Sequence, residues 1–294
     1  MEALHELVPL ALRTSVFLIV FAIGLDVSFR DTSYLFRRPG LLLRSITAID
    51  IIVPAFAALM VALLPLHPFV KTGIVLMAVS PFAPILPGKE LKTGGRKSYV
   101  YDLLFVISTL SIVIVPVTVA LLGAAFGEKA SIAPGAVAKL ILTSVILPLA
   151  AGMIVRRIWP ARSKRAKPVI STVASIVLAV AVLPVLFAVW HSVVALIGDG
   201  TVLAILAVVA VGFLAGHLLG GPDPRDRAVL AISSASRHPG IALLIAGANF
   251  REPRVKAVIL LFLVVGLIAT VFYQVWCKRR YPELRQPAPD NAES

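Results

Sequence analysis

The residues of this sequence best able to do chemistry stand together inside an apolar run, SSASRHPGIALLIAGANF, at residues 233–250. Arg237 and His238 are the tenth and eleventh of the 21 residues between Arg227 and Asn249, so they lie near the middle of any membrane that this run crosses. An arginine at the centre of a spanning helix costs about 2.5–3.5 kcal/mol on insertion scales. Arg237 is therefore a candidate functional residue whose partner must come from elsewhere in the chain.

Two roles fit the position of Arg237. One is an ion pair, for which the available acids are Asp50, near the middle of its own apolar run, and Asp102, nearer the end of another. The other is a fixed positive charge that balances helix ends or binds an anionic substrate. Both roles stay open and can hold in alternate states. His238 titrates in a range suited to proton coupling, and a neutral hydrogen-bonding histidine is the alternative.

Composition places these residues in an all-α polytopic membrane protein. Hydrophobic residues make up 59% of the chain and charged residues 15%, whereas soluble domains contain roughly 45–50% apolar residues. The mean hydropathy is +0.96. The charges lie in clusters separated by apolar runs of about 20 residues, the length of a membrane-spanning helix. The nine predicted transmembrane helices are Leu7–Leu25, Gly40–Leu64, Val70–Pro87, Ser98–Gly123, Pro134–Val155, Pro168–Trp190, Thr201–Leu219, Ala228–Ala248 and Val255–Cys277.

The distribution of Lys and Arg predicts the orientation in the membrane. Nine spans place the connecting segments alternately on the two sides, and one side receives 19 Lys and Arg residues against five on the other. The positive-inside rule makes the richer side cytoplasmic. We therefore expect a multi-pass protein of the plasma (inner) membrane with its N-terminus outside and its C-terminus cytoplasmic. The same rule explains the formal net charge of +13 without a nucleic-acid partner.

Two of the predicted spans, the third and the eighth, contain residues that interrupt a helix. Each has a Pro-Gly pair, and three prolines in the third span remove backbone donors. The two spans are five apart in order, so they enter the membrane from opposite sides. Matched interruptions in two inverted halves indicate a secondary transporter whose substrate site lies where the broken helices meet. The predicted helix breaks are Pro81, Pro84, Pro87, Gly88, Pro239 and Gly240.

This pairing of spans also predicts the organisation of the chain. A single transmembrane domain over residues 1–277 would contain inverted repeat units at 7–123 and 168–277, linked by an unpaired span at 134–155. Residues 278–294 are rich in proline and polar residues and predict a disordered cytoplasmic tail.

Several segments carry a family resemblance. They are FAIGLDVSFRDTSYLFRRPGLLL, DIIVPAFAAL, the broken segment at 80–88, FVISTLSIVIVPV at 105–117 and AISSASRHPGIALLIAGANF. In this order, over about residues 7–277, the chain resembles the bile acid:sodium symporter family, within a superfamily that includes arsenite carriers and auxin-efflux-like carriers. The resemblance implies two inverted five-span repeats, here without the first span, and a panel domain beside a core whose two broken helices cross at mid-membrane.

The resemblance also locates sodium sites, and the residues at those positions differ here. It implies a glutamate and a Gln-Asn pair before the second break, where this chain has Ser233, Arg237 and His238. It implies small polar ligands at the first break, where Ile85, Leu86 and Pro87 stand. A sodium ion needs several oxygen ligands and is repelled by a fixed guanidinium. We therefore expect transport without sodium coupling.

The remaining polar residues predict a binding site and no enzyme. Ser108 and Thr109 are candidate polar lining, although such hydroxyls often bond to their own helix backbone. The single Cys277 and the scattered histidines show no metal-ligand spacing, and no nucleotide-binding loop or nucleophile motif is present, so no metal or cofactor is expected. The candidate substrate-binding or charge-balancing residues are Arg237, His238, Ser233, Ser236, Asp50, Ser108 and Thr109.

These observations predict a secondary transporter that moves a small organic anion across a lipid bilayer by alternating access. The alternative is a membrane sensor or scaffold that keeps the transporter fold without transporting. Coupling to protons and the oligomeric state stay open. Solute flux in proteoliposomes separates the two functions.

Overall fold

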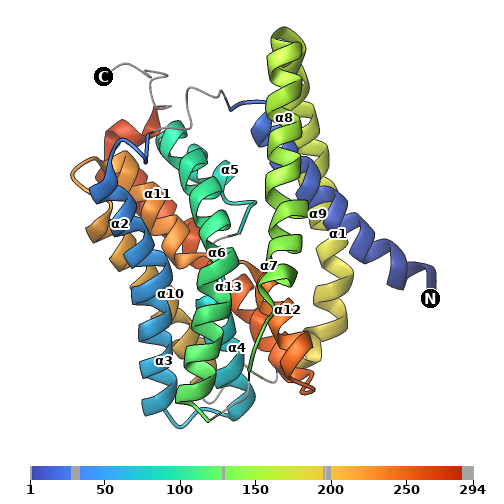
Figure 1. The fold of residues 1–294 in the computed structure, drawn as a ribbon, viewed down its shortest axis with the longest axis vertical. Helices are drawn as coiled ribbons and strands as arrows, with labels where there is room; N and C mark the ends of the chain where they lie inside the picture. Colours follow the sequence, from blue (N-terminus) through green and yellow to red (C-terminus); the bar gives the residue numbers. More distant parts are fainter. Residues whose placement is uncertain are drawn as a thin grey trace.

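Helices form all the regular elements in the residues that this computed structural model describes, which are 2–27, 34–81, 83–127, 130–194, 196 and 200–286 (Figure 1). Seven of the α-helices begin with proline, whose fixed φ suits the first helical position and whose missing N–H is not needed there. In chain order the elements are α1 (Glu2–Gly24), α2 (Pro39–Ile46), η1 (Thr47–Ile52), α3 (Val53–Leu63), α4 (Pro68–Val79), α5 (Pro87–Lys92), α6 (Lys97–Ala125), α7 (Pro134–Ile141), η2 (Leu142–Ile146), α8 (Leu147–Ile158), α9 (Pro160–Val194), α10 (Thr201–Leu219), α11 (Pro224–Ala235), α12 (Pro239–Asn249), α13 (Arg254–Arg280) and the 3₁₀ turn η3 (Pro282–Arg285).

Eight helical stretches among the described residues are long and apolar enough to cross a membrane. The predicted third span is not one of them, because α4 ends after 12 residues and α5 begins only at Pro87. The eighth predicted span is also broken, but α11 and α12 are separated by only three residues. The expected all-α polytopic architecture is therefore confirmed, with eight helical stretches of spanning length among the described residues and the third predicted span interrupted, as its prolines predict.

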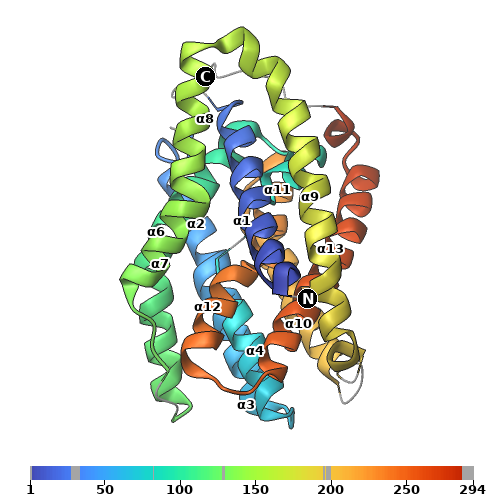
Figure 2. The same cartoon turned by 90° about the vertical axis from the view of Figure 1, so that its right-hand side faces the viewer.

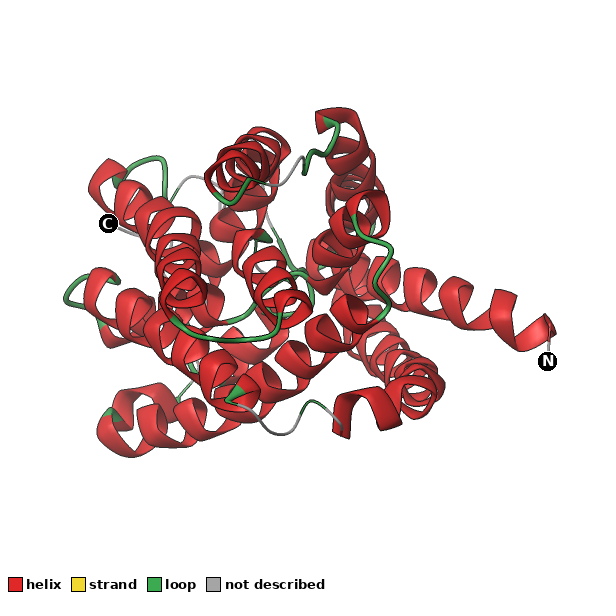
Figure 3. Cartoon of the chain, turned by 90° about the horizontal axis from the view of Figure 1, so that it is seen from below, coloured by secondary structure: helices red, strands yellow, loops and turns green. Residues whose placement is uncertain are grey.

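The helices form two groups that lie side by side. Figure 1 shows α1, α8 and α9 along one flank, and α1 packs against both of the others. We call α1, α7, η2, α8 and α9 the flank bundle, and the remaining helices the core bundle. Figure 2 shows α8 and α9 joined as a hairpin at the end of the molecule that also holds the C-terminus. Seen from below in Figure 3, the N-terminal end of α1 extends away from the other helices.

Glycines allow the closest helix contacts in both bundles. A Cβ at Gly216 of α10 would lie 2.4 Å from the Leu230 carbonyl oxygen and from Ala231 Cα on α11. In the flank bundle, a Cβ at Gly24 of α1 would lie 2.3 Å from the Leu149 carbonyl oxygen on α8. Small residues are the usual means by which membrane helices bring their backbones together. These contacts fix α11, which carries Arg237 at its end, against α10.

The outer surface is apolar, as a surface in contact with lipid requires. Phe187 is 77% exposed, and Leu203 and Phe272 are each 72% exposed. Large exposed apolar areas of this kind mark contact with a membrane or with another protein. Together with the helix lengths, this surface identifies a multi-pass membrane protein.

The first part of the predicted disordered tail is ordered in the structure. Helix α13 continues to Arg280, and η3 follows it at Pro282–Arg285. Leu284 is 1% exposed and packs against Gly94, while Arg225 donates to the carbonyls of Glu283 and Gln286. The expectation of disorder from residue 278 onward is therefore wrong for residues 278–286, because one apolar side chain finds a buried position. Residues 287–294 lie outside the described residues.

Candidate functional site

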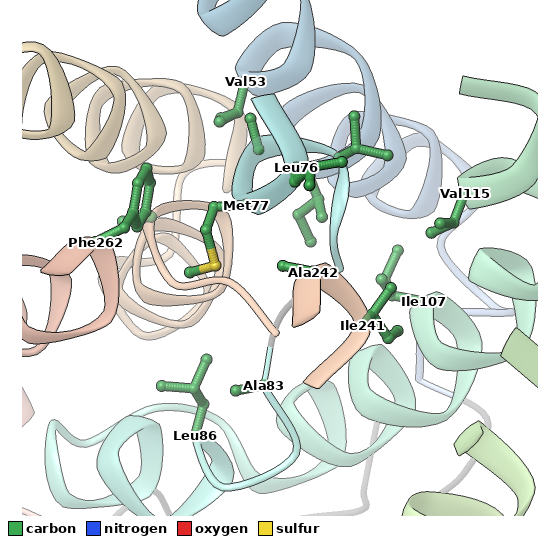
Figure 4. Close-up of a cluster of buried hydrophobic side chains, with 14 of the residues drawn as sticks. Val53, Leu76, Met77, Ala83, Leu86, Ile107, Val115, Ile241, Ala242 and Phe262 are labelled. Carbon is green, nitrogen blue, oxygen red and sulfur yellow. The ribbon is translucent and has the colours of Figure 1, made fainter. Parts of the chain in front are cut away.

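The two helix breaks meet in the core bundle. Helix α4 stops at Val79 and helix α11 at Ala235, and the backbone N–H of His238 donates to the carbonyl of Pro81 at 2.6 Å. Pro87 and Pro239 begin the helices that follow the breaks. Figure 4 shows a cluster of buried apolar side chains around this crossing, whose labelled members come from α3, α4, the segment after it, α6, α12 and α13. The sequence had placed both interruptions, and the structure joins them by a backbone hydrogen bond.

The guanidinium of Arg237 lies at the crossing and binds three backbone carbonyls. Its Nη1 donates to the Ile49 oxygen at 2.9 Å and to the Ser80 oxygen at 3.4 Å, and its Nη2 donates to the Ser234 oxygen at 2.7 Å. Arg237 is only 2% exposed. One side chain therefore connects η1, the end of α4 and the end of α11.

Two of these carbonyls lack a helical donor, one because its helix has ended and one because a proline follows it. Ser80 comes directly after α4 with an extended backbone, so no helical N–H reaches its carbonyl. Ile49 lies in the π-helical segment η1, where the donor would come from the residue five positions on, and that residue is Pro54. Arg237 supplies the missing donors.

The third carbonyl is free because the second break redirects its donor. His238 is four residues after Ser234, but its N–H donates to Pro81 across the crossing. Carbonyls in the last turn of a helix also carry partial negative charge, which a nearby cation stabilises. Arg237 therefore places a positive charge at the C-terminal ends of both α4 and α11.

The ion pair between Arg237 and Asp50, one of the two roles left open by the sequence, is not formed in this structure. The ion pairs within the described ranges join other residues, and Asp50 Oδ2 is buried without a hydrogen-bond partner. Asp50 lies within electrostatic reach of Arg237 nonetheless. Asp102 is engaged elsewhere, since its Oδ2 accepts the Leu35 N–H at 2.8 Å. Backbone carbonyls, rather than a carboxylate, hold the guanidinium.

Several polar atoms at the crossing have no partner. Arg237 Nε, Ser234 Oγ and His238 Nε2 are buried and unbonded among the described residues. A cavity of about 20 Å³ adjoins Arg237 and Ser236, enough space for about one water molecule. Buried polar atoms normally find partners, so this cluster indicates a place where water or a ligand group completes the hydrogen bonds.

His238 is held in a defined protonation pattern. Its Nδ1 accepts the Gly240 N–H at 3.1 Å, so Nδ1 carries no proton and the ring is neutral in this geometry. This bond also caps the first turn of α12. His238 accepts a backbone hydrogen bond in this structure, and proton coupling through it stays a prediction.

Two of the predicted site residues lie apart from the crossing. Thr109 is exposed, and its hydroxyl donates to the Phe105 carbonyl one turn earlier at 2.8 Å. Ser108 is buried, and its carbonyl accepts the Ser111 hydroxyl at 2.7 Å. Both helix bonds follow the usual behaviour of hydroxyls in membrane helices. The structure does not bring either residue to Arg237.

Ser233 has a partner that sequence reasoning missed. Its hydroxyl donates to Glu90 Oε1, from the short helix α5 on the other side of the two breaks. Glu90 is 1% exposed, and its Oε2 has no hydrogen-bond partner. The sequence contains one signal for this contact, an acidic residue in the first turn of the helix that begins at Pro87-Gly88. A carboxylate at that position is unusual if the helix is buried.

The turns α3–α4 and α12–α13 lie at one end of the molecule, which we call the outer end. A larger cavity lies between this end and the crossing. Its volume is about 230 Å³, and Val79, the residue before Ser80, is part of its wall. Lys71 and Thr72 are the polar side chains of an otherwise apolar lining that includes Phe126 and Phe250. Lys71 is thus the single charged side chain among the described residues in the wall of this cavity.

At the other end, which we call the basic end, Asp26 connects the two bundles. Its carboxylate accepts from Lys97 Nζ at 3.0 Å and Tyr101 Oη at 2.8 Å on α6, and from Lys167 Nζ at 2.6 Å on α9. Arg156 of α8 donates to its backbone oxygen. Burial raises the pKa of Asp26, but the hydrogen bonds outweigh burial and lower this pKa from 3.8 to about 2. Asp26 is therefore ionised and joins the core bundle to the flank bundle at this end.

A second polar cluster ties the core bundle together at the basic end. Arg96 Nε donates to Asp226 Oδ1 at 3.0 Å, and Arg96 also pairs with Asp223. Tyr34 donates to Asp226 Oδ2 at 2.7 Å, and burial followed by this bond raises the pKa of Tyr34. These contacts account for acidic residues whose role the sequence had not indicated.

The family to which the chain belongs is shown by its similarity to known protein families. The model of the sodium bile acid symporter family matches residues 14–196, more than half of the chain. The chain belongs to the sodium bile acid symporter family. Because members of this family are membrane transporters, the symporter-family chain is assigned to that class. The match also confirms the resemblance seen in its sequence. No curated protein matches it.

The family match covers the first break and not the second. It includes α4, α5 and Asp26, and it ends before α10, so Arg237 lies beyond it. Among the described residues, no group of three or more His, Cys, Asp or Glu side chains is arranged to hold a metal ion. The guanidinium at the second break therefore lies outside the part of the chain that the family model matches.

Proposed function

We propose that this member of the sodium bile acid symporter family is a secondary transporter that moves a small organic anion by alternating access without sodium as the coupling ion. The observation that carries the proposal is the guanidinium of Arg237 on the carbonyls of Ile49, Ser80 and Ser234. These oxygens are the kind of ligands that would otherwise hold a metal cation, and a covalently fixed cation already occupies them. A second cation there would be repelled at short range.

The outer cavity supports the substrate class. Its lining is apolar except for Thr72 and one cationic side chain, Lys71. Binding sites of this kind use apolar walls for affinity and a few polar groups for orientation. A permanently charged organic anion with a compact apolar body, such as benzenesulfonate, matches both features.

We expect the protein in proteoliposomes to take up benzenesulfonate equally well from sodium and from choline media of the same ionic strength. The reason is that Arg237 satisfies the carbonyls that sodium would need. Sodium should also leave the melting temperature of the purified protein unchanged, because an ion that does not bind the folded state adds no stability. Isotope flux and a thermal-shift assay measure the two effects.

Benzamide, the neutral analogue, is the matched control and should neither stabilise the protein nor be transported. Saturable sodium dependence of uptake would overturn the sodium-independent mechanism. Stabilisation by benzenesulfonate without any flux would instead favour the sensor or scaffold that was the alternative from the sequence.

The contacts of Asp26 support a closed basic end and an accessible outer end in this conformation. The carboxylate links α6 of the core bundle to α9 of the flank bundle, while the 230 Å³ cavity lies at the outer end. Alternating access then requires the Asp26 contacts to break. By the positive-inside rule, the basic end faces the cytoplasm of an inner-membrane protein.

Asp26→Asn is expected to loosen the basic end, because the amide loses the ionic attraction of Lys97 and Lys167. Amide hydrogen exchange should become faster in residues 20–27 and 97–101. Since the pKa of Asp26 is lowered to about 2, its stabilisation is present above its unfolded value of 3.8 and is lost as the pH falls toward 2. The wild type should therefore approach the exchange rates of the variant only in strong acid.

Glu252→Gln provides the control, since it breaks the exposed ion pair with Arg254 at the outer end. This change should leave exchange at residues 20–27 unaltered. Equal exchange in Asp26→Asn and the wild type at neutral pH would show that the contacts do not hold the basic end closed.

A further inference from the structure

Glu90 is a buried carboxyl group without a cation. It is 1% exposed on α5, and no ion pair within the described ranges includes it. Ser233 donates to Oε1, while Oε2 is buried with no hydrogen-bond partner. A carboxylate ion in such a place keeps one hydrogen bond and loses its remaining hydration.

Among the described residues, no charged or titratable group on the elements packed against α5 forms an ion pair with Glu90. On α6, Tyr99 shares a 2.8 Å hydrogen bond with Ser45, and Arg96 pairs with Asp223 and Asp226 of α11. On α13, Gln274 donates to the backbone oxygen of Lys89 and not to the carboxyl group. The further groups are Lys89 and Lys92 on α5 itself, which are half-buried and exposed respectively, Lys97, Tyr101 and Asp102 on α6, Arg225 and Arg227 on α11, and Tyr273 and Cys277 on α13.

This arrangement favours the neutral form of the carboxyl group. Transfer of an unpaired carboxylate into a low-dielectric interior costs far more than transfer of the neutral acid, and such groups take up a proton instead. The one hydrogen bond from Ser233 does not replace the cation that a buried carboxylate requires. A proton on Oε2 removes the charge while Oε1 keeps its bond.

We propose that Glu90 is a proton-binding site, where the carboxyl group holds a proton on Oε2 against Ser233 and releases it to water when α5 and α11 separate at the basic end. In the release step the O–H bond of the acid breaks, the proton passes to a water molecule, and the carboxylate is left with its negative charge. Protonation of the site is independent of transport, whereas its use as the coupling ion rests on the proposed function.

The position of α5 allows such exchange. This six-residue helix lies between the first break and Gly94. Gly94 has a φ of 91°, a backbone conformation that residues with a side chain rarely adopt, and it turns the chain away after the helix. The C-terminal turn covers that loop, because Leu284 packs on Gly94 and Arg225 donates to the Gly94 carbonyl. Movement of this short, separately hinged segment would expose Glu90 to water without unfolding a long helix.

The test is infrared spectroscopy of the full-length protein in nanodiscs at neutral pH. The wild type should show the C=O stretch of a protonated carboxyl group that shifts in D2O and disappears in Glu90→Gln. Ser233→Ala should move that band to higher frequency, because a hydrogen bond to the C=O is lost. Asp50→Asn removes another buried carboxyl group with an unbonded oxygen and should leave the Ser233-dependent band in place.

Glu90→Gln imitates the protonated acid, so it should melt no lower than the wild type. An unchanged carboxyl spectrum in Glu90→Gln, a clear loss of stability in that variant, or disappearance of the wild-type band when sodium replaces choline would each overturn the proton site. In proteoliposomes, an acid-outside gradient should drive benzenesulfonate uptake by the wild type and not by Glu90→Gln. If both accumulate it equally, proton coupling through Glu90 fails while transport itself stands.

Discussion

Replacement of Arg237 by alanine is expected to abolish transport and to lower the melting temperature of the purified protein by several degrees. The change leaves the carbonyls of Ile49, Ser80 and Ser234 without donors at the crossing. Each buried polar group that loses its partner costs about 1–3 kcal/mol, and the desolvation recovered by removing the guanidinium offsets only part of this. Membrane insertion should improve slightly, because an arginine is costly at mid-membrane.

Two further variants separate charge from geometry. Arg237→Lys keeps the charge but not the planar fork that reaches three carbonyls, so it should restore little of the stability. Asp50→Asn should be nearly neutral, because Asp50 makes no ion pair with Arg237. Wild-type flux and melting in Arg237→Ala would contradict the charge-balancing role. Recovery of stability in Arg237→Gln combined with Asp50→Asn would restore the ion-pair role instead.

Gly216→Ala is expected to have the second large effect, a loss of about 1–3 kcal/mol in stability, since added atoms in a packed interface force the backbones apart. The new Cβ would lie 2.4 Å from the Leu230 oxygen and Ala231 Cα, both of which are backbone atoms that cannot rotate away. Helix α11 would have to move, and with it Ser233 and Arg237. Benzenesulfonate flux should therefore fall together with the melting temperature.

Gly247→Ala is the matched control, because a Cβ there meets nothing within 4 Å and the residue lies in a helix. It should be neutral, or stabilising by about 0.5–1 kcal/mol through the better helix propensity of alanine. Equal melting temperatures for the two variants would show that the contact between α10 and α11 tolerates separation.

The sequence by itself determined where the helices run and where they break. Apolar runs of spanning length and the absence of N–H groups at Pro81, Pro84 and Pro87 are local properties, so the interrupted third span follows from them without knowledge of any contact. The same is true of the second break at Pro239-Gly240 and of the choice of Arg237 as the residue that needs an explanation.

Only the tertiary structure decided what these residues bind. The sequence offered Arg237 either the carboxylates of Asp50 and Asp102 or unspecified helix ends and substrates, whereas the structure shows that it binds the backbone carbonyls of Ile49, Ser80 and Ser234. Every residue has such a carbonyl, so the sequence does not show which of them lack a donor. The sequence did not single out Glu90 for a related reason. It stands among lysines next to a predicted span, and its hydrogen-bond partner, Ser233, is 143 residues away in the chain. Local chemistry sets where a backbone must break, but the partner of a buried charge depends on which distant segments the fold brings within hydrogen-bond distance, and residue spacing carries no information on that.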